Sequence, residues 1–170
     1  INNHPKIKTI EKIIFISSTS VYPNIEGFFN EEFEIENSSS KIVYEAEKLV
    51  LNKSDIIFRV SALVGANRVS GRRLSNKVVE YPKSVINFVH RNDVIDATKF
   101  VIENNLNGTF NLCCKEHPSK EDLYSFNAKK YDFALPIFSE NKEFLNRTID
   151  GSKIEQLGFI YKHNNAFDLI

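Results

Sequence analysis

Methionine and tryptophan are absent from this sequence of 170 residues, and cysteine occurs only twice, at Cys113 and Cys114. Neighbouring residues of a strand point to opposite faces of a sheet, so we expect no structural disulfide between these adjacent cysteines. They fit instead as small core residues in a reducing compartment, which indicates the cytoplasm. Because a native start normally supplies a methionine, we expect Ile1 to lie inside a longer protein.

Excess charge and long apolar runs are also missing. Lysine and arginine together number 22, as do aspartate and glutamate, so the composition indicates neither a nucleic-acid partner nor an anionic membrane surface. No apolar run approaches the roughly 18 residues of a membrane span, and no signal peptide is visible. No cluster of His, Cys and Asp has metal-ligand spacing. The length and composition indicate one compact domain with its own core.

Two continuous apolar runs, 12–17 (KIIFIS) and 55–63 (DIIFRVSAL), are typical of strands buried on both faces of a parallel sheet. Residues 23–40, between the first run and the next helix, predict a long loop that packs a few aromatics. Residues 39–52 predict a helix. Its apolar residues, at helical spacing, are Ile42, Val43, Ala46, Leu49 and Val50.

The second half of the chain repeats this alternation. Strands are expected at 85–89 and 109–113, with a helix from about 92 to 104 between them and another capped by Ser119. His90, between a strand and a helix, is expected to play a structural role at the junction. Strands that alternate with helices indicate an α/β fold.

Five segments, in chain order, are similar to motifs of one known family. FISSTSVYP resembles its strand ending in Ser-Ser-x-x-Val-Tyr, and FRVSALVGANR its Arg-x-x-x-x-Tyr-Gly-Pro-Gly-Arg stretch. INFVHRNDVIDA, GTFNLCCKEHPSKEDLY and IDGSKIEQLGF resemble its Ile-His-Val-x-Asp-Val, Gly-x-Tyr-Asn-Leu and Ser-Lys-x-x-x-Leu-Gly-Phe patterns. On these segments the sequence resembles the extended short-chain dehydrogenase/reductase family (the NAD-dependent epimerase/dehydratase group), and atypical members within it.

The resemblance implies a Rossmann-like parallel sheet, truncated at its N-terminal side, with a small C-terminal substrate subdomain. Residues 1–114 would then be the later part of an NAD(P)-binding domain, and 115–170 the substrate side. The family opens with a Gly-x-x-Gly-x-x-Gly turn that lets a helix N-terminus approach the pyrophosphate. Here the glycines are dispersed, so the chain alone is expected to bind NAD or NADP poorly. They stand at positions 27, 65, 71, 108, 151 and 158.

The resemblance also implies a catalytic set of a serine, a tyrosine and a lysine. Ser18, four residues before Tyr22, matches the serine that orients the substrate oxygen. Tyr44 and Lys48 form a Tyr-x-x-x-Lys sequence, which places both on one helical face. In the family the tyrosine transfers the proton and the lysine lowers its pKa, while the cofactor carries the hydride.

A second register of the same helix is equally open. Family members carry an Ala-Glu pair after the lysine. If Ala46 and Glu47 are that pair, the tyrosine and lysine positions fall at Ser39 and Val43, and both functional groups are lost.

The remaining expected contacts also follow from the resemblance. The cofactor-binding residues would be Ser17, Tyr44, Lys48, Val60, Ser61 and Ala62. The substrate-binding residues would be Ser20, Arg68 and Arg72, since arginines suit phosphate or carboxylate groups.

The expected function is that of an NAD(P)-dependent oxidoreductase or epimerase. It would act on a hydroxyl or carbonyl of a small, sugar-like substrate when the protein is intact, and a homodimer is compatible with the resemblance. The alternative is a non-catalytic dinucleotide-binding sensor or regulatory protein of the same fold. The position of Tyr44 relative to Ser18 discriminates between the two.

Overall fold

A computed structural model describes residues 10–141, 143 and 145–168 of the chain. Its central element is a parallel sheet of β1 (Ile14–Ser18), β3 (Ile56–Val60) and β7 (Gly108–Leu112), in the spatial order β1-β3-β7. β1 and β3 pair in register from Ile14 opposite Ile56 to Ser18 opposite Val60. The parallel arrangement of these two runs is therefore confirmed, and the chain has the predicted α/β fold. The expected burial on both faces is confirmed for β3 but is wrong for β1, because Ile16 is 55% exposed.

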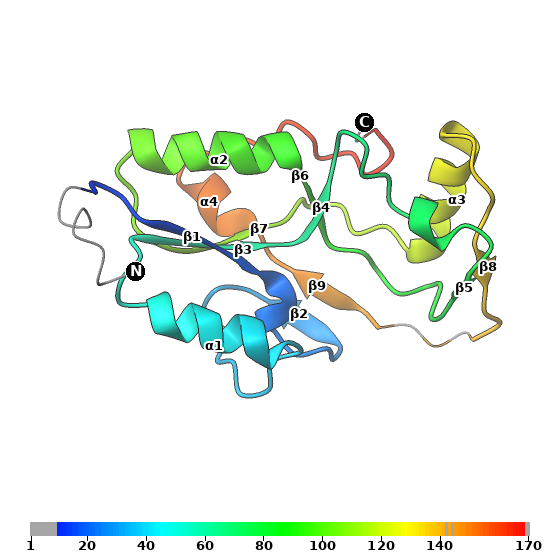
Figure 1. Ribbon diagram of the computed structural model, residues 1–170, viewed down its shortest axis with the longest axis horizontal. Helices are drawn as coiled ribbons and strands as arrows, with labels where there is room; N and C mark the ends of the chain where they lie inside the picture. The colour runs from blue at the N-terminus through cyan, green and yellow to red at the C-terminus, as the bar shows by residue number, and fades with distance from the viewer. Residues whose placement is uncertain (1–9, 142, 144, 169–170) are drawn as a thin grey trace.

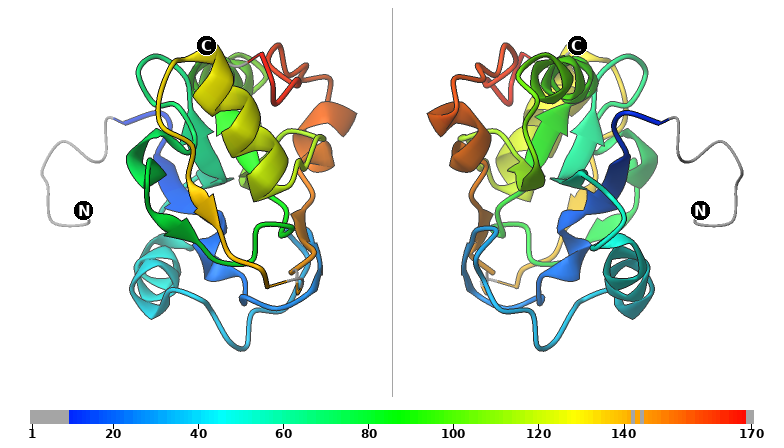
Figure 2. Two further views of the ribbon diagram at one scale, coloured as in Figure 1. Left: turned by 90° about the vertical axis from the view of Figure 1, so that its right-hand side faces the viewer. Right: turned by 90° about the vertical axis from the view of Figure 1, so that its left-hand side faces the viewer.

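Helices cover both faces of this sheet. α1 (Lys41–Val50) crosses from β1 to β3 on one face, and α2 (Arg91–Glu103) and α4 (Ser152–Gln156) lie on the other (Figures 1 and 2). His90 ends the strand before α2 and caps that helix, because its Nδ1 accepts the Asn92 N–H at 3.1 Å. Its expected structural role at the junction is confirmed. No helix of the described residues has both the length and the apolar character of a membrane span.

Three short parallel pairs extend the molecule beyond the main sheet. They are β2 (Gly27–Phe29) with β9 (Arg147–Ile149), β4 (Ala62–Val64) with β6 (Phe88–His90), and β5 (Val78–Val79) with β8 (Ile137–Phe138). The last pair lies at one end of the molecule with α3 (Lys120–Lys130) (Figure 1). β2 corrects the prediction of a long loop over 23–40, because strand pairing with a distant part of the chain leaves no local signal. The expected packing of its aromatics is confirmed for Phe29 and Phe33.

The hydrophobic core lies in two parts. The larger part packs the sheet against α2 and α4 and includes Phe58, Phe88, Phe110 and Leu123. The smaller part is formed by Val21, Tyr22, Phe29, Cys113 and Ile149, with Tyr44 at its margin. Both cysteines are buried with free thiols, as the sequence predicts.

The buried face of α1 includes only part of the predicted apolar set, since Val50 is buried and Val43 packs against the smaller core. Ile42 and Leu49 are 84% and 69% exposed, whereas Glu47 is buried against the sheet. Glu47 is buried because its charge partner, Arg59, lies on β3. An apolar pattern alone could not reveal this pairing.

Candidate functional site

A hollow of about 550 Å³ opens where β1 and β3 end. Ligands of α/β proteins bind outside the carboxyl ends of parallel strands, so this place is the natural candidate site. We call this space the strand-end hollow, and six of its fifteen lining residues carry a hydroxyl group. Its serines are Ser17, Ser18, Ser20, Ser39 and Ser61, and Thr19 lies beside them.

One rim of the strand-end hollow joins two segments that are distant in the sequence. Ser18 ends β1, and its Oγ accepts the Ser20 N–H at 3.2 Å, which starts a 3-10 turn over Thr19–Val21. The hydroxyl of Ser39, just before α1, donates to the Ser20 carbonyl at 2.7 Å. The rim therefore holds serines from the end of β1 and from the start of α1.

The end of β3 contributes Val60, Ser61 and Ala62 to the opposite wall. The Ser61 N–H donates to Leu112 O at 3.0 Å, which fixes this turn to β7. The Ser61 hydroxyl is buried and finds no nitrogen or oxygen partner in the described residues; the group beside it is the Cys113 thiol. Buried polar atoms are usually hydrogen-bonded, and the Cys113 thiol, whose pKa a hydrogen bond with Ser61 lowers, is the partner of this hydroxyl.

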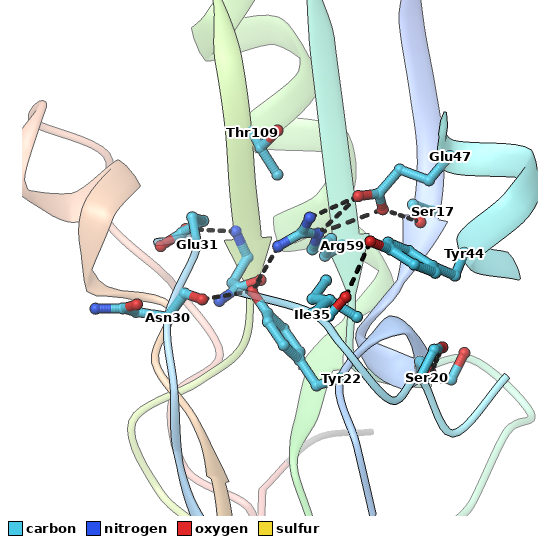
Figure 3. A network of polar contacts seen from close by, with 12 residues as sticks. Ser17, Ser20, Tyr22, Asn30, Glu31, Ile35, Tyr44, Glu47, Arg59 and Thr109 are labelled. Carbon is cyan, nitrogen blue, oxygen red and sulfur yellow. Dashed lines mark hydrogen bonds and ion pairs between the residues drawn. The ribbon is translucent and has the colours of Figure 1, made fainter. Parts of the chain in front are cut away.

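A buried ion pair between Glu47 and Arg59 contacts Ser17, one of the residues that line the hollow (Figure 3). Arg59 donates to Glu47 through Nη2 at 2.6 Å and through Nε at 3.1 Å. Ser17 donates to the second oxygen of the same carboxylate at 2.7 Å. Burial lowers the pKa of Arg59, but the hydrogen bond and charge of Glu47 outweigh this effect and leave the pKa raised. Ser17 is thus held by α1 and is less available to a ligand than Ser18.

A chain of hydrogen bonds leads from Arg59 to the uncharged side chains of Tyr22 and Asn111. Arg59 Nη1 donates to the Tyr22 hydroxyl at 2.9 Å, and that hydroxyl lies 2.9 Å from Asn111 Oδ1 and 2.8 Å from Asn30 O. Burial raises the pKa of Tyr22 despite the opposing charge of Arg59. Tyr22 is fully buried and therefore supports the fold around the site.

Tyr44 and Lys48 do not line the strand-end hollow. The Tyr44 hydroxyl donates to Ile35 O at 3.0 Å (Figure 3). Lys48 pairs with Glu45 at 3.1 Å and lies over the Tyr44 ring at 4.4 Å from its centroid. The structure therefore does not bring the expected catalytic trio together in this hollow, and their joint role stays a prediction. The second register fits better, because Ser39 lines the hollow with Ser18.

The residues that the sequence predicts to bind the substrate do not all line the same hollow. Ser20 and Arg68 line the strand-end hollow. Arg72 instead lines a neighbouring hollow of about 660 Å³, to which Arg68 also contributes. Its guanidinium lies 5.7 Å from the centre of the Phe133 ring and 3.4 Å from Tyr131 O.

Three polar residues of the strand-end hollow were not predicted from the sequence: Asn24, Asn87 and Arg147. Arg147 begins β9, and the pairing of β9 with β2 carries it to the hollow. Asn87 fixes β9 from the other side, since it donates to Arg147 O at 2.7 Å and accepts the Ile149 N–H at 2.8 Å. No sequence signal marks Arg147, because its approach depends on a contact between residues more than a hundred positions apart.

Comparisons with known proteins place this geometry in context. No family model matches the chain. It is 32% identical over 162 residues to Protein YeeZ of Escherichia coli (strain K12), a match that covers 91% of this chain and 59% of that protein. The chain thus spans about three-fifths of the length of this curated relative.

Solved structures share the fold. UDP-glucuronic acid 4-epimerase from Bacillus cereus, in complex with NAD, superposes with a TM-score of 0.73 at 21% identity, over 94% of this chain and 59% of that one. ADP-L-glycero-D-manno-heptose-6-epimerase from Helicobacter pylori superposes with a TM-score of 0.74 at 17% identity, over 96% of this chain and 58% of that one. The chain therefore has the fold of part of the NAD-dependent epimerase/dehydratase structures.

Proposed function

We propose that the whole protein is an NAD(P)-dependent oxidoreductase or epimerase, and that this chain supplies its substrate side. The substrate would be a small, sugar-like molecule with a hydroxyl or carbonyl at the reacting carbon. The observation that carries the proposal is the strand-end hollow itself, a hydroxyl-lined space at the carboxyl ends of β1 and β3. The fold shared with an epimerase that binds NAD supports the cofactor class.

The residues present fit one end of such a cofactor. Val60, Ser61 and Ala62 line the strand-end hollow where β3 ends. These residues would hold the part of the dinucleotide that enters the hollow, where it would supply the hydride acceptor or donor. The sequence has no glycine-rich turn for the pyrophosphate, so the proposed contacts are confined to this end.

The side chains of the rim would orient the substrate. Ser18 and Ser39 offer hydroxyls that both donate and accept, which suits a sugar hydroxyl or a carbonyl. Ser18 would keep the reacting oxygen in line with the cofactor, and Ser39 would occupy the place where the resemblance expects a tyrosine. Substrate orientation by hydrogen bonds of this kind is a recognised contribution to catalysis.

A second function, a dinucleotide-binding sensor or regulatory protein, is favoured by one observation. Among the described residues that line the strand-end hollow, the titratable side chains are Arg68 and Arg147. Arginine stays protonated at any working pH, so neither residue can act as a general acid–base group. A protein that binds the cofactor without turning over a substrate would need no such group.

The test uses the whole protein, with NAD(P) binding measured by calorimetry and hydride transfer measured against a panel of sugars and their keto forms. Ser18→Ala is expected to lower kcat/KM roughly a hundredfold, the scale of one lost transition-state hydrogen bond, with unchanged cofactor affinity. Cofactor binding without turnover on any compound would favour the sensor. Absence of NAD(P) binding would exclude both functions.

Tyr44→Phe in the same assay decides the prediction made from the Tyr-x-x-x-Lys spacing. A loss of turnover of roughly a hundredfold or more would identify Tyr44 as the general acid–base group. A change of only a few fold would agree with a hydroxyl that is bonded to Ile35.

A further inference from the structure

A hollow of about 330 Å³ lies beside α2 and shares no lining residue with the strand-end hollow. We call it the α2 hollow. Part of its lining belongs to the C-terminal segment, which runs past the start of α2 (Figure 1). The lining residues are Asn92, Ile95, Asp96, Lys99, Lys162 and His163. A ligand bound here would therefore contact a different set of residues from a ligand in the strand-end hollow.

A buried carboxylate orients the imidazole of His163. Asp93, in the first turn of α2, is fully buried and accepts the backbone N–H groups of Lys162 at 3.0 Å and of His163 at 3.1 Å. Its Oδ1 also lies 3.0 Å from Nδ1 of the His163 ring. An ionised carboxylate can only accept hydrogen bonds, so Nδ1 carries the proton of this contact. In the neutral ring the lone pair is then on Nε2.

A structural role accounts for only part of this arrangement. The two backbone bonds would fasten the C-terminal segment to α2 whatever side chain stood at position 163. The bond to Nδ1 needs an imidazole, and it fixes the orientation and the tautomer of that ring. The same contact, a buried carboxylate behind Nδ1, prepares the histidine of serine proteases to react at Nε2.

The exposure of His163 indicates which part of its ring a ligand can reach. His90 stacks on one face, with the two ring centroids 3.8 Å apart, and Nδ1 faces Asp93. The side chain is nevertheless 29% exposed and lines the α2 hollow. Within the described residues, Nε2 makes no hydrogen bond. The accessible edge of the ring is therefore the one that carries Nε2, and an imidazole nitrogen with a lone pair is a nucleophile.

His90 and His117 are held differently. His90 is 5% exposed, and its Nδ1 accepts the Asn92 N–H. Burial lowers the pKa of His117, and its Nδ1 has no hydrogen-bond partner among the described residues. His117 therefore provides a control of the same residue type outside the α2 hollow.

Two lysines give the α2 hollow a positive lining. Lys162 Nζ lies 2.7 Å from Asp96 Oδ2, and Lys99 Nζ lies 3.6 Å from Oδ1 of the same carboxylate. The hydrogen bond to Asp96 raises the pKa of Lys162, so its ammonium stays charged at neutral pH. Both lysines are mostly exposed, and an ammonium has three N–H donors, so each keeps donors for a ligand. Two cations against one carboxylate in the lining attract an anionic reagent.

We propose that Nε2 of His163 is a nucleophile that accepts the phosphoryl group of a small acyl phosphate. Nε2 would form a bond to phosphorus as the bond between phosphorus and the acyl oxygen breaks, and the acyl group would leave as a carboxylate. The ring, which keeps its Nδ1 proton, would then be cationic, and Asp93 would balance this charge. Lys99 and Lys162 would bind the phosphoryl oxygens by charge-assisted hydrogen bonds. The reaction needs no oxidant, reductant or further reactant.

The experiment incubates the intact protein with acetyl phosphate and locates the added phosphoryl group by mass spectrometry of its peptides. His163 should be modified, and His163→Gln should abolish the modification. His117→Gln, the matched control, should leave it unchanged. Asp93→Asn keeps a hydrogen-bond acceptor but removes the charge, so it should slow the reaction about tenfold or more, the scale of one charged hydrogen bond.

Diethyl pyrocarbonate distinguishes a phosphoryl site from an imidazole that is merely accessible, because this reagent acylates histidine nitrogens and carries no charge. The double variant Lys99→Gln/Lys162→Gln should slow phosphorylation about tenfold or more, whereas the rate with diethyl pyrocarbonate should change by less than about twofold. Both lysines are exposed, so this variant should fold like the wild-type protein.

Three results would overturn the inference: no phosphoryl group on His163, equal modification of His117, or a rate of phosphorylation that the double lysine variant leaves unchanged. Reaction of His163 with diethyl pyrocarbonate alone counts as the first of these. If Asp93→Asn does not fold, the lysine variant and the His117 control decide instead. A negative result leaves the proposed function standing, because the two hollows share no lining residue.

Discussion

The ion pair between Glu47 and Arg59 offers the sharpest test of how this fold supports its site. Glu47→Ala would remove a carboxylate that is 3% exposed and that accepts hydrogen bonds from both Arg59 and Ser17. Arg59, which is 8% exposed, would keep only its bond to the uncharged Tyr22 hydroxyl. The variant would therefore leave a charge in the interior without its counter-charge.

The expected cost follows from that geometry. Removing one partner of a buried ion pair destabilises a protein by about 3–5 kcal/mol. For a chain of this size, 1 kcal/mol corresponds to a change in Tm of about 2–4 °C. Glu47→Ala should thus lower the Tm by about 6–20 °C, measured by circular dichroism, with the free energy of unfolding taken from urea titration.

Two variants control this measurement. Glu45→Ala lies on the same helix and removes an exposed pair with Lys48, so its effect should stay below about 1 kcal/mol. The double variant Glu47→Met/Arg59→Met replaces both charges by apolar groups and should recover most of the loss. If Glu47→Ala cost less than about 1 kcal/mol, Arg59 would have to reach water or another partner, and the argument for a rigid support under Ser17 would fail.

Other expectations concern the core, the thiols and the cofactor. Gly151→Ala would bring a methyl group into a steric clash with the Cys113 carbonyl oxygen, a backbone atom. The free energy of unfolding, measured by thermal unfolding, should therefore fall by about 1–3 kcal/mol. The control variant Ser152→Ala should change the free energy of unfolding by less than about 0.5 kcal/mol. Burial raises the pKa of Cys113 from 9.0 to about 12, so iodoacetamide at neutral pH should label the thiol only after unfolding. In the unfolded chain this thiol ionises at its ordinary pKa, so the stability it contributes should be complete below about pH 9 and lost as the pH rises toward 12; a free energy of unfolding that increased over this range would contradict the assignment. Calorimetry on the 170-residue chain should show weak or no NAD(P) binding, because its sequence has no glycine-rich turn for the pyrophosphate; tight binding would mean that other residues hold the dinucleotide.

Local patterns were sufficient to predict the central sheet. Continuous β-branched runs with a helix between them allow few arrangements other than a parallel pair with a crossover, and β1, α1 and β3 form that unit. The position of the serine cluster was also predictable, because polar residues directly after a parallel strand must lie at its carboxyl end. Ser18 and Ser20 line the strand-end hollow for this reason.

The spacing of Tyr44 and Lys48 shows what such patterns leave open. Four residues of separation place two side chains on one helical face, but they do not determine which face the helix turns to the site. That choice depends on Glu47, which pairs with Arg59 on β3 and sets the rotation of α1. Tyr44 is consequently turned to Ile35.

The sequence by itself determined the order of the main strands and helices and the polar end of β1, because each depends on neighbouring residues and on the fixed periods of helix and strand. Only the tertiary structure decided which face of α1 is buried and which charges meet at the site. Glu47 is buried because of a partner 12 residues away on another element, and Arg147 reaches the hollow by bonds to residues 124 and 128 positions away. Such contacts depend on charge and geometry across the folded chain, and the local sequence carries no record of them.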